Sequence, residues 1–207
     1  MFSRVLPINM AQTVAFASLS PARKLMLCDA GAYPLTTYVT ARAAGERQQV
    51  RVICGDNRFD PYAIARFAKS KGVRPAAALN AIRIARAFTA YQLVELINRL
   101  TPDAPGDLVV ISGPCSTFLD EDVPLVDAAR LFYRALWRIS ELAGDGMTLL
   151  IAQSEIPANT RRAYFLTDLC RACDVVLRLD GEHTFALENR RRAALPYLAA
   201  LDGIMGD

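Results

Sequence analysis

The sequence lacks most of the residue patterns from which enzyme chemistry is usually inferred. It contains one histidine, His183, and no Gly-x-Ser-x-Gly pattern. A serine or cysteine nucleophile needs a positioned base, which is most often histidine, and that pattern marks the nucleophile turn of α/β-hydrolases. We therefore do not expect an enzyme of the Ser-His-Asp or Cys-His class.

The cysteines predict neither a disulfide framework nor a zinc site. The five cysteines are Cys28, Cys54, Cys115, Cys170 and Cys173. An odd number of scattered cysteines does not predict a set of disulfides. The pair Cys170-x-x-Cys173 has no second pair, and a structural zinc site needs four ligands. We interpret the cysteines as small buried apolar residues and expect no metal and no cofactor.

Strong charge and long hydrophobic runs are also missing. The net charge is +3, which permits a nucleic-acid partner without indicating one. No apolar run is long enough to span a bilayer. The first residues include Pro7, Asn9 and Gln12, so they are too polar for the core of a signal peptide. We expect a cytoplasmic protein without a membrane contact.

What the chain does contain is a regular alternation of strand and helix patterns. Hydrophobic residues make up 53% of the 207 residues, enough for one α/β domain with a substantial core. Strands are predicted at 24–28, 50–54, 82–87, 108–111, 147–152, 175–179 and 184–187. Helices are predicted at 35–44, 61–71, 90–100, 123–143, 161–172 and 193–204.

This alternation predicts a mostly parallel central sheet flanked by helices. Val109 and Ile151 should lie on adjacent buried strands, because their segments are continuously apolar. Asp180-Gly181 predicts a hairpin turn, which gives the sheet a C-terminal β-hairpin. We divide the single domain, 1–207, into an N-terminal segment or linker (1–22), a core (23–196) and a tail (197–207).

One stretch of the chain resembles the RecA/RadA recombinase family. Residues 82–89 read IRIARAFT and are followed by Gln92-Leu93, which is similar to the family's "ARAFN…Q" segment. Upstream, Phe59-Asp60-Pro61 and residues 65–68 (ARFA) resemble its "F.P.RL…A" stretch. The resemblance extends over about 24–196 and is most specific between Cys54 and Leu93. It implies a RecA-like core.

The phosphate-binding loop that the resemblance implies is degenerate. The family's G-x-x-x-x-G-K-[ST] loop presents backbone amides and a lysine to phosphates and a hydroxyl to magnesium. Here residues 29–36 read DAGAYPLT, and the chain has no Gly-Lys-Thr/Ser tripeptide. Asp29 and Pro34 replace the two glycines, Leu35 replaces the lysine, and Thr36 remains. A threonine at that point is most simply a helix cap.

The remaining nucleotide residues of the family are also replaced. Ser112 stands where the family's second acidic motif ends a buried strand with a magnesium-binding aspartate. Asp56 falls at the position of the catalytic glutamate, and the alternative interpretation is a polar residue at a strand end. Gln153 and Ser154 replace an Asn-Gln pair that senses nucleotide. The resemblance therefore implies a pseudo-ATPase without catalytic residues.

Five arginines are candidates for DNA binding. The loop at 118–122 (FLDED) corresponds to the family's first DNA-binding loop, but its three acids would repel phosphates. Basic residues follow later strands, where ligands of open α/β sheets bind. The candidates are Arg161, Arg162, Arg190, Arg191 and Arg192. The alternative interpretation is a solvated run of charge.

One segment near the N-terminus is a candidate for contact with other subunits. Phe16-Ala17-Ser18-Leu19 lies where the family joins its subunits through a phenylalanine and an alanine, but Leu19 replaces the alanine. Phe16 packing on its own core is the alternative. Arg83 and Arg86 are expected to make structural salt bridges. We expect a non-catalytic recombinase paralogue that supports or modulates DNA recombination or repair. Its expected partner is a recombinase or another RecA-like subunit. Weak non-specific DNA binding and homo-oligomerisation are further expectations.

Two alternatives are kept beside this expectation. One is an active ATPase with an unorthodox phosphate site, and the other is a RecA-fold protein-interaction regulator outside recombination. Binding of ATP separates the active ATPase from the paralogue. Loss of DNA affinity when the arginines are replaced separates the paralogue from the regulator.

Overall fold

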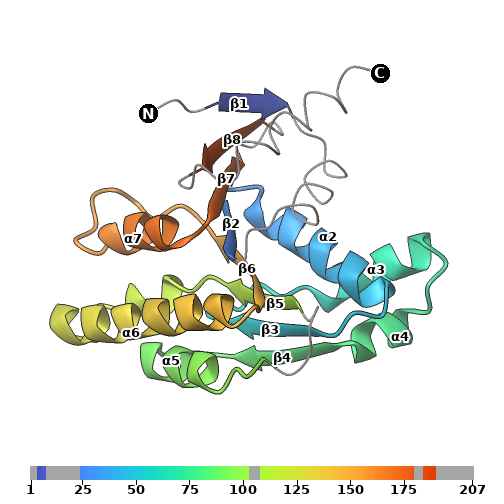
Figure 1. The fold of residues 1–207 in the computed structure, drawn as a ribbon, viewed down its shortest axis with the longest axis horizontal. Helices are drawn as coiled ribbons and strands as arrows, with labels where there is room; N and C mark the ends of the chain where they lie inside the picture. Colours follow the sequence, from blue (N-terminus) through green and yellow to red (C-terminus); the bar gives the residue numbers. More distant parts are fainter. Residues whose placement is uncertain (1–3, 8–23, 103–107, 180–183, 190–207) are drawn as a thin grey trace.

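A single eight-stranded sheet runs through the centre of the protein (Figure 1). The computed structural model describes residues 4–7, 24–102, 108–179 and 184–189. The strands follow the order β1-β8-β7-β2-β6-β5-β3-β4. Their bounds are β1 Arg4–Pro7, β2 Lys24–Cys28, β3 Val50–Cys54, β4 Ile82–Arg86, β5 Leu108–Ser112, β6 Thr148–Gln153, β7 Val175–Leu179 and β8 Thr184–Asn189.

The six strands from β7 to β4 are all parallel. At the other edge, β8 pairs antiparallel with β7, and β1 pairs antiparallel with β8. This arrangement confirms the predicted fold class, an α/β protein with a mostly parallel sheet and a C-terminal hairpin, and is consistent with a RecA-like core. Strand β1 has no counterpart among the predicted elements.

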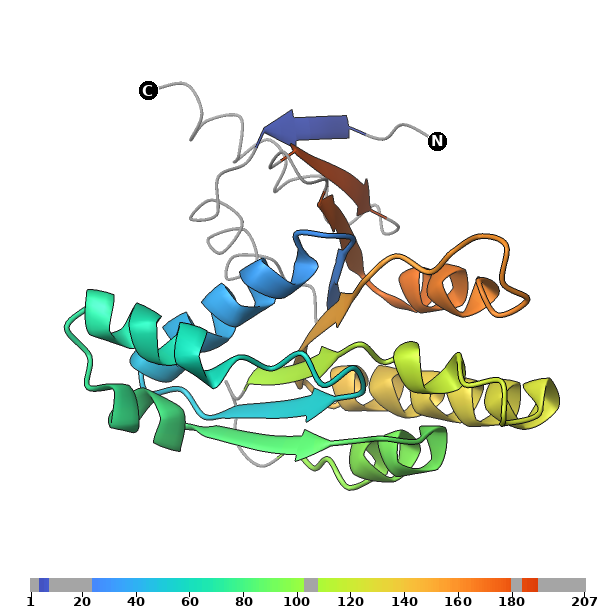
Figure 2. The same ribbon diagram turned by 180° about the vertical axis from the view of Figure 1, so that it is seen from behind.

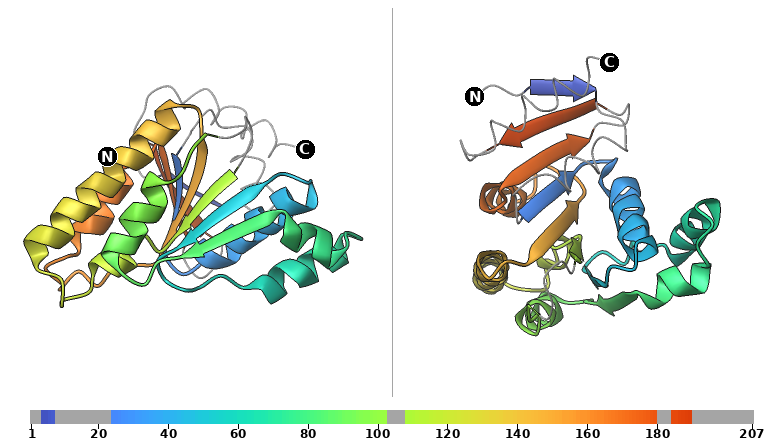
Figure 3. Two further views of the ribbon diagram at one scale, coloured as in Figure 1. Left: turned by 90° about the horizontal axis from the view of Figure 1, so that it is seen from below. Right: turned by 45° about the vertical axis from the view of Figure 1, so that its right-hand side comes forward.

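The helices cover the sheet in two layers (Figures 2 and 3). One layer holds α2 (Ala32–Gly45), α3 (Pro61–Ser70) and α4 (Pro75–Asn80), and the other holds α5 (Ala90–Asn98), α6 (Leu125–Gly144) and α7 (Tyr164–Ala172). A short 3-10 helix, η1 (Ser116–Phe118), leads from β5 toward α6. Among the described residues, no helix combines the length and hydrophobicity needed to cross a membrane.

The two layers divide the core because successive strand residues face opposite sides of the sheet. Val109 and Ile111 belong to the core under α5–α7, whereas Leu108 and Val110 belong to the core under α2–α4. The prediction for Val109 and Ile151 is confirmed: both side chains are fully buried, and they lie on the paired strands β5 and β6.

Helix starts account for the main local differences from the predictions. Helix α3 begins as expected, with the Asp60 carboxylate accepting the N–H groups of Tyr62 and Ala63 and with proline in the first turn. Helix α2 begins at Ala32, earlier than predicted, because Pro34 is tolerated in a first helical turn. Helix α4 was not predicted, and the predicted helix at 193–204 lies outside the described residues.

Candidate functional site at the carboxyl ends of the strands

The carboxyl ends of β2, β3, β5 and β6 form the natural ligand position of this sheet. From β2 and β3 the chain continues into the α2–α4 layer, whereas from β5 and β6 it continues into the α5–α7 layer. In open α/β sheets, ligands bind where neighbouring connections leave toward opposite faces. The positions that the resemblance matches to the recombinase family's nucleotide residues gather at this edge.

A hydrogen-bonded cluster of three side chains joins these strand ends. The Ser112 hydroxyl donates to the Asp56 carboxylate, at 3.0 and 3.1 Å from its two oxygens. The Tyr33 hydroxyl hydrogen-bonds to Asp56 and accepts the backbone N–H of Ser154 at 3.2 Å. Burial, followed by the hydrogen bond to Asp56, raises the pKa of Tyr33 to about 12. Tyr33 is therefore a neutral brace between α2, β3 and β6.

Close backbone packing leaves little space around this cluster. A Cβ atom on Gly113 would lie 2.3 Å from the Cβ of Asp56, and one on Gly55 would lie 2.7 Å from the Gly113 carbonyl oxygen. Gly113 also has a φ of +59°, which only glycine adopts readily. The neighbouring cavity, lined by Tyr33 and Ser112 among others, measures about 20 Å³, about enough for one water molecule.

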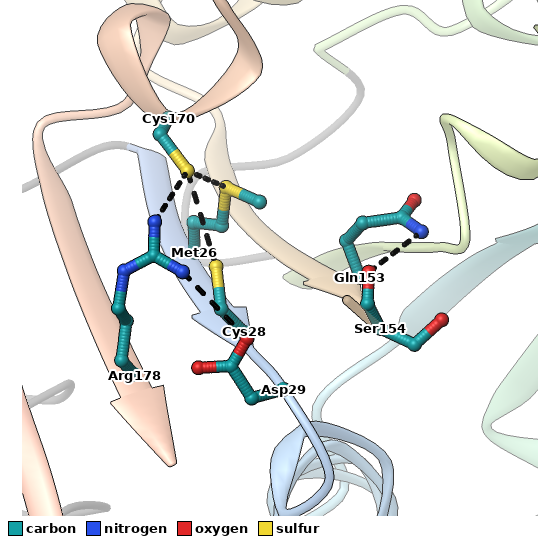
Figure 4. A network of polar contacts seen from close by, with 7 residues as sticks. All are labelled: Met26, Cys28, Asp29, Gln153, Ser154, Cys170 and Arg178. Atoms are coloured by element: carbon teal, nitrogen blue, oxygen red, sulfur yellow. Dashed lines mark hydrogen bonds and ion pairs between the residues drawn. The ribbon is translucent and has the colours of Figure 1, made fainter. Parts of the chain in front are cut away.

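The loop at 29–36 does not form a phosphate cradle. Asp29 has a φ of +73°, and its carboxylate lies 3.6 Å from the Arg178 guanidinium (Figure 4). The Leu35 side chain is buried in the core under α2–α4, where a phosphate-binding lysine would have to reach outward. The interpretation of Thr36 as a cap is wrong: Gly31 precedes α2, and the Thr36 hydroxyl donates to the Ala32 carbonyl at 2.7 Å within it.

Both polar atoms of the Gln153 side chain form hydrogen bonds with backbone groups. Its side chain is 1% exposed, and its Oε1 accepts the N–H of Cys115 at 2.8 Å. Its Nε2 donates to the carbonyl of Ser154 at 3.2 Å. The Oε1 of the amide therefore ties β6 to the segment after β5, whereas its Nε2 is satisfied by the next residue of its own segment.

The cysteines beside the site are structural. All five are free and buried, which confirms their interpretation as buried apolar residues. The Cys28 and Cys170 sulfurs are 4.0 Å apart, and the Cys170 sulfur is 3.8 Å from the Met26 sulfur (Figure 4). The hydrogen bond to Cys170 and burial raise the pKa of Cys28, and burial raises that of Cys115. These thiols stay protonated and are poor nucleophiles.

A metal centre is not present in the described part of the chain. Among those residues, no three histidine, cysteine or carboxylate side chains are placed to share an ion.

The structure corrects the expectation for Arg162. Its side chain is buried, and its guanidinium donates to the backbone carbonyls of Phe118, Asp120 and Val123. It holds the acidic loop at 118–122 and is not available to a phosphate. A buried arginine is acceptable there because several carbonyls receive its donors.

The other candidate arginines have different outcomes. Arg161 is exposed and stays a candidate. Arg190, Arg191 and Arg192 lie outside the described residues, as does Phe16-Ala17-Ser18-Leu19. Arg83 and Arg86 are exposed on β4, the outermost parallel strand, and neither has an ion-pair partner within the described ranges. The expected structural salt bridges are therefore not seen there.

Tyr33 is the residue that sequence reasoning missed. In the sequence it is one residue of the loop at 29–36, and a tyrosine between alanine and proline carries no pattern of its own. No protein-family model and no curated protein sequence matches the chain. The resemblance to recombinases therefore rests on the residues quoted for it.

Proposed function

We propose that this protein is a RecA-like pseudo-ATPase that supports or modulates an active recombinase in DNA recombination or repair, mainly through protein contacts. The observation that carries the proposal is the cluster of Tyr33, Asp56 and Ser112. The chain's own side chains fill the edge of the sheet where the family would place a nucleotide, and they satisfy one another there.

Charge and shape at this edge both disfavour ATP. The site presents the Asp56 and Asp29 carboxylates. Arg178 lies beside Asp29 at 3.6 Å and is engaged there. A triphosphate would add negative charge to a space of about 20 Å³, at a high electrostatic cost. Leu35, turned into the core, supplies no compensating cation.

A surface suited to protein contact lies at the β4 edge. Ile84 is 42% exposed, Phe88 is 72% exposed and Tyr91 is 54% exposed, and Arg83 and Arg86 are exposed on the same segment. Aromatic and arginine side chains dominate the binding energy of many protein interfaces. An exposed edge strand also offers unpaired backbone groups to a partner. These features favour a partner protein, which we take to be a RecA-like subunit.

The decisive experiment on nucleotide is a melting curve with and without millimolar magnesium-ATP. A ligand that binds the folded state must raise the melting temperature, so we expect no shift. A Tyr33→Ala variant, which removes the side chain that fills the site, should still show none, because Leu35 and Asp29 remain. A clear shift in the wild type would favour the alternative of an active ATPase with an unorthodox phosphate site.

DNA binding separates this proposal from a regulator outside recombination. Fluorescence anisotropy with labelled single- and double-stranded oligonucleotides should show weak, sequence-independent binding that falls with salt. Replacing Arg190, Arg191 and Arg192 together should flatten the salt dependence by roughly one unit of slope for each phosphate contact. An Arg162 variant is unsuitable, because that residue is structural. Absence of binding at low salt would favour the regulator.

The partner contact is testable at β4. Purified recombinase from the same cells should bind the wild-type chain in a pull-down or by interferometry. Phe88→Ser should reduce that binding, because Phe88 is exposed and its replacement leaves the core intact. Tyr62→Ser, which changes another exposed aromatic residue on α3, is the control. Equal loss in both variants, or in neither, would count against β4 as the contact.

A further inference from the structure

A groove between α2 and α3 lies apart from the strand ends. It measures about 350 Å³, within the size range of small-molecule sites. It is formed near the carboxyl ends of both helices, whereas Tyr33 lies in the first turn of α2. The lining residues are Tyr38, Arg42, Gly45, Glu46, Phe67, Ala68, Lys71 and Val73.

The walls and floor of the groove are apolar. Tyr38 and Phe67 meet edge to face, with ring centroids 5.0 Å apart and planes at 79°. Ala68 is buried beneath them, and Val73 lies opposite Gly45. A Cβ on Gly45 would meet nothing closer than a Val73 methyl at 3.9 Å. The missing side chain of Gly45 therefore leaves part of the groove open.

The side chains of the rim carry one unbalanced positive charge. Arg42 and Glu46 neutralise each other through an ion pair of 2.9 Å. The Lys71 ammonium lies 6.0 Å from the centre of the Phe67 ring and has no carboxylate partner in the described part of the chain. The Tyr38 hydroxyl likewise has no hydrogen-bond partner among the described residues. The Lys71 ammonium and the Tyr38 hydroxyl are thus two donors, within the described ranges, on residues that line the groove.

We propose that the groove between α2 and α3 binds a small, flat, apolar carboxylate, such as an aromatic acid. The ring system would lie against Tyr38, Phe67 and Val73, where burial of apolar surface supplies the binding free energy. The carboxylate would meet the Lys71 ammonium and the Tyr38 hydroxyl. A cation is disfavoured because Lys71 already lies over the Phe67 ring.

The first experiment tests whether a side chain placed in the groove prevents binding of a probe. Naphthalene-2-carboxylate is the probe, and binding is followed by saturation-transfer NMR and by backbone amide shifts of α2 and α3. Gly45→Leu places a side chain in the groove without a backbone clash, and leucine favours a helix more than glycine does. We expect the variant to melt no lower than the wild type and to lose probe binding.

Gly144→Leu is the matched control. Gly144 ends α6, and a Cβ there meets no atom within 4 Å, but it does not line the groove. This variant should bind the probe as the wild type does. Equal probe binding in the Gly45→Leu variant, or no amide shifts in α2 and α3 at millimolar probe, would overturn the proposal.

The second experiment tests the charge. Naphthalene-2-carboxamide, which is neutral and similar in shape, should bind the wild type about twofold to fivefold more weakly than the carboxylate, as expected for an exposed ion pair. Lys71→Met should abolish this preference while keeping the apolar contacts, and Lys69→Met, in the last turn of α3, should not. A preference that survives Lys71→Met, or a stronger binding of the amide, would contradict the assigned ligand class. These results do not depend on ATP or DNA binding, so they test the groove independently of the proposed function.

Discussion

The two helical layers bury different kinds of side chain against the same sheet. Helices α5–α7 contribute large residues, including the rings of Phe132 and Phe165, whose centroids are 4.5 Å apart, with Phe118 of η1 packed beside them. Helices α2–α4 contribute Leu35, Ile64 and a set of alanines. The buried alanines of that set are Ala32, Ala43, Ala44, Ala68 and Ala78.

We infer from this difference that the α5–α7 layer contributes more to stability. The α2–α4 layer, with its smaller side chains, leaves space for polar groups. Small side chains of α2 face the sheet, and Tyr33 in the first turn of α2 reaches Asp56, which follows β3. They also leave the groove beside Ala68 at the other end of α2. In the opposite layer the rings of Phe118, Phe132 and Phe165 pack against one another, with centroids 4.5 to 6.0 Å apart, as is typical of well-packed interiors.

The largest expected effect is therefore in the α5–α7 layer. Phe132→Ala should lower the free energy of unfolding by about 3–5 kcal/mol, because it leaves a cavity and removes ring contacts with Phe118 and Phe165. Leu35→Ala in the other layer should cost less, about 2–3 kcal/mol. Urea unfolding of both variants measures the difference. An equal or larger cost for Leu35→Ala would break the comparison between the layers.

Arg162 extends the stabilising layer to the loop after η1. Arg162→Met should lower the free energy of unfolding by about 2–3 kcal/mol, because it removes the donors to three carbonyls, of which that of Phe118 is buried. Arg161→Met, at the exposed neighbour, should change stability by less than about 0.5 kcal/mol. Amide hydrogen exchange at 118–123 should rise in the first variant alone. Equal stability of the two variants would show that the clamp contributes nothing.

Tyr33→Phe should have the smallest effect, about 1 kcal/mol, because it removes hydrogen bonds at a half-buried site. The pKa of Tyr33, about 12 in the folded state, exceeds the ordinary value near 10. The folded state keeps this proton where the unfolded state has lost it, so stability falls as pH rises from about 10 to 12. This decline should be shallower in Tyr33→Phe than in the wild type.

The control for the alkaline decline is Tyr62→Phe, at an exposed tyrosine of α3. Melting temperatures between pH 9 and 12 provide the measurement. Other buried groups, such as Cys54, whose burial raises its pKa to about 11, affect all variants alike. Parallel profiles for Tyr33→Phe and the wild type would show that Tyr33 is not a neutral brace at the strand ends.

The sequence by itself determined the fold class and most of the elements. Alternating apolar strands and amphipathic helices repeat along the chain, and that local pattern is enough to predict a parallel sheet between helices. Strand β5 is apolar at four successive positions, Leu108–Ile111, so its burial on both faces is readable without a structure. The absence of a Gly-Lys-Thr/Ser tripeptide was equally readable, because it concerns which residues are missing.

Only the tertiary structure decided what fills the edge of the sheet. Tyr33, Asp56 and Ser112 come from three separate segments, and Arg162 reaches a loop about forty positions earlier in the chain. Such contacts depend on strand order and on the direction of each side chain, which no local pattern contains. The groove between α2 and α3 could not be predicted from the sequence for the same reason. Its open space exists because two helices pack side by side and present Ala68 and Gly45 to it.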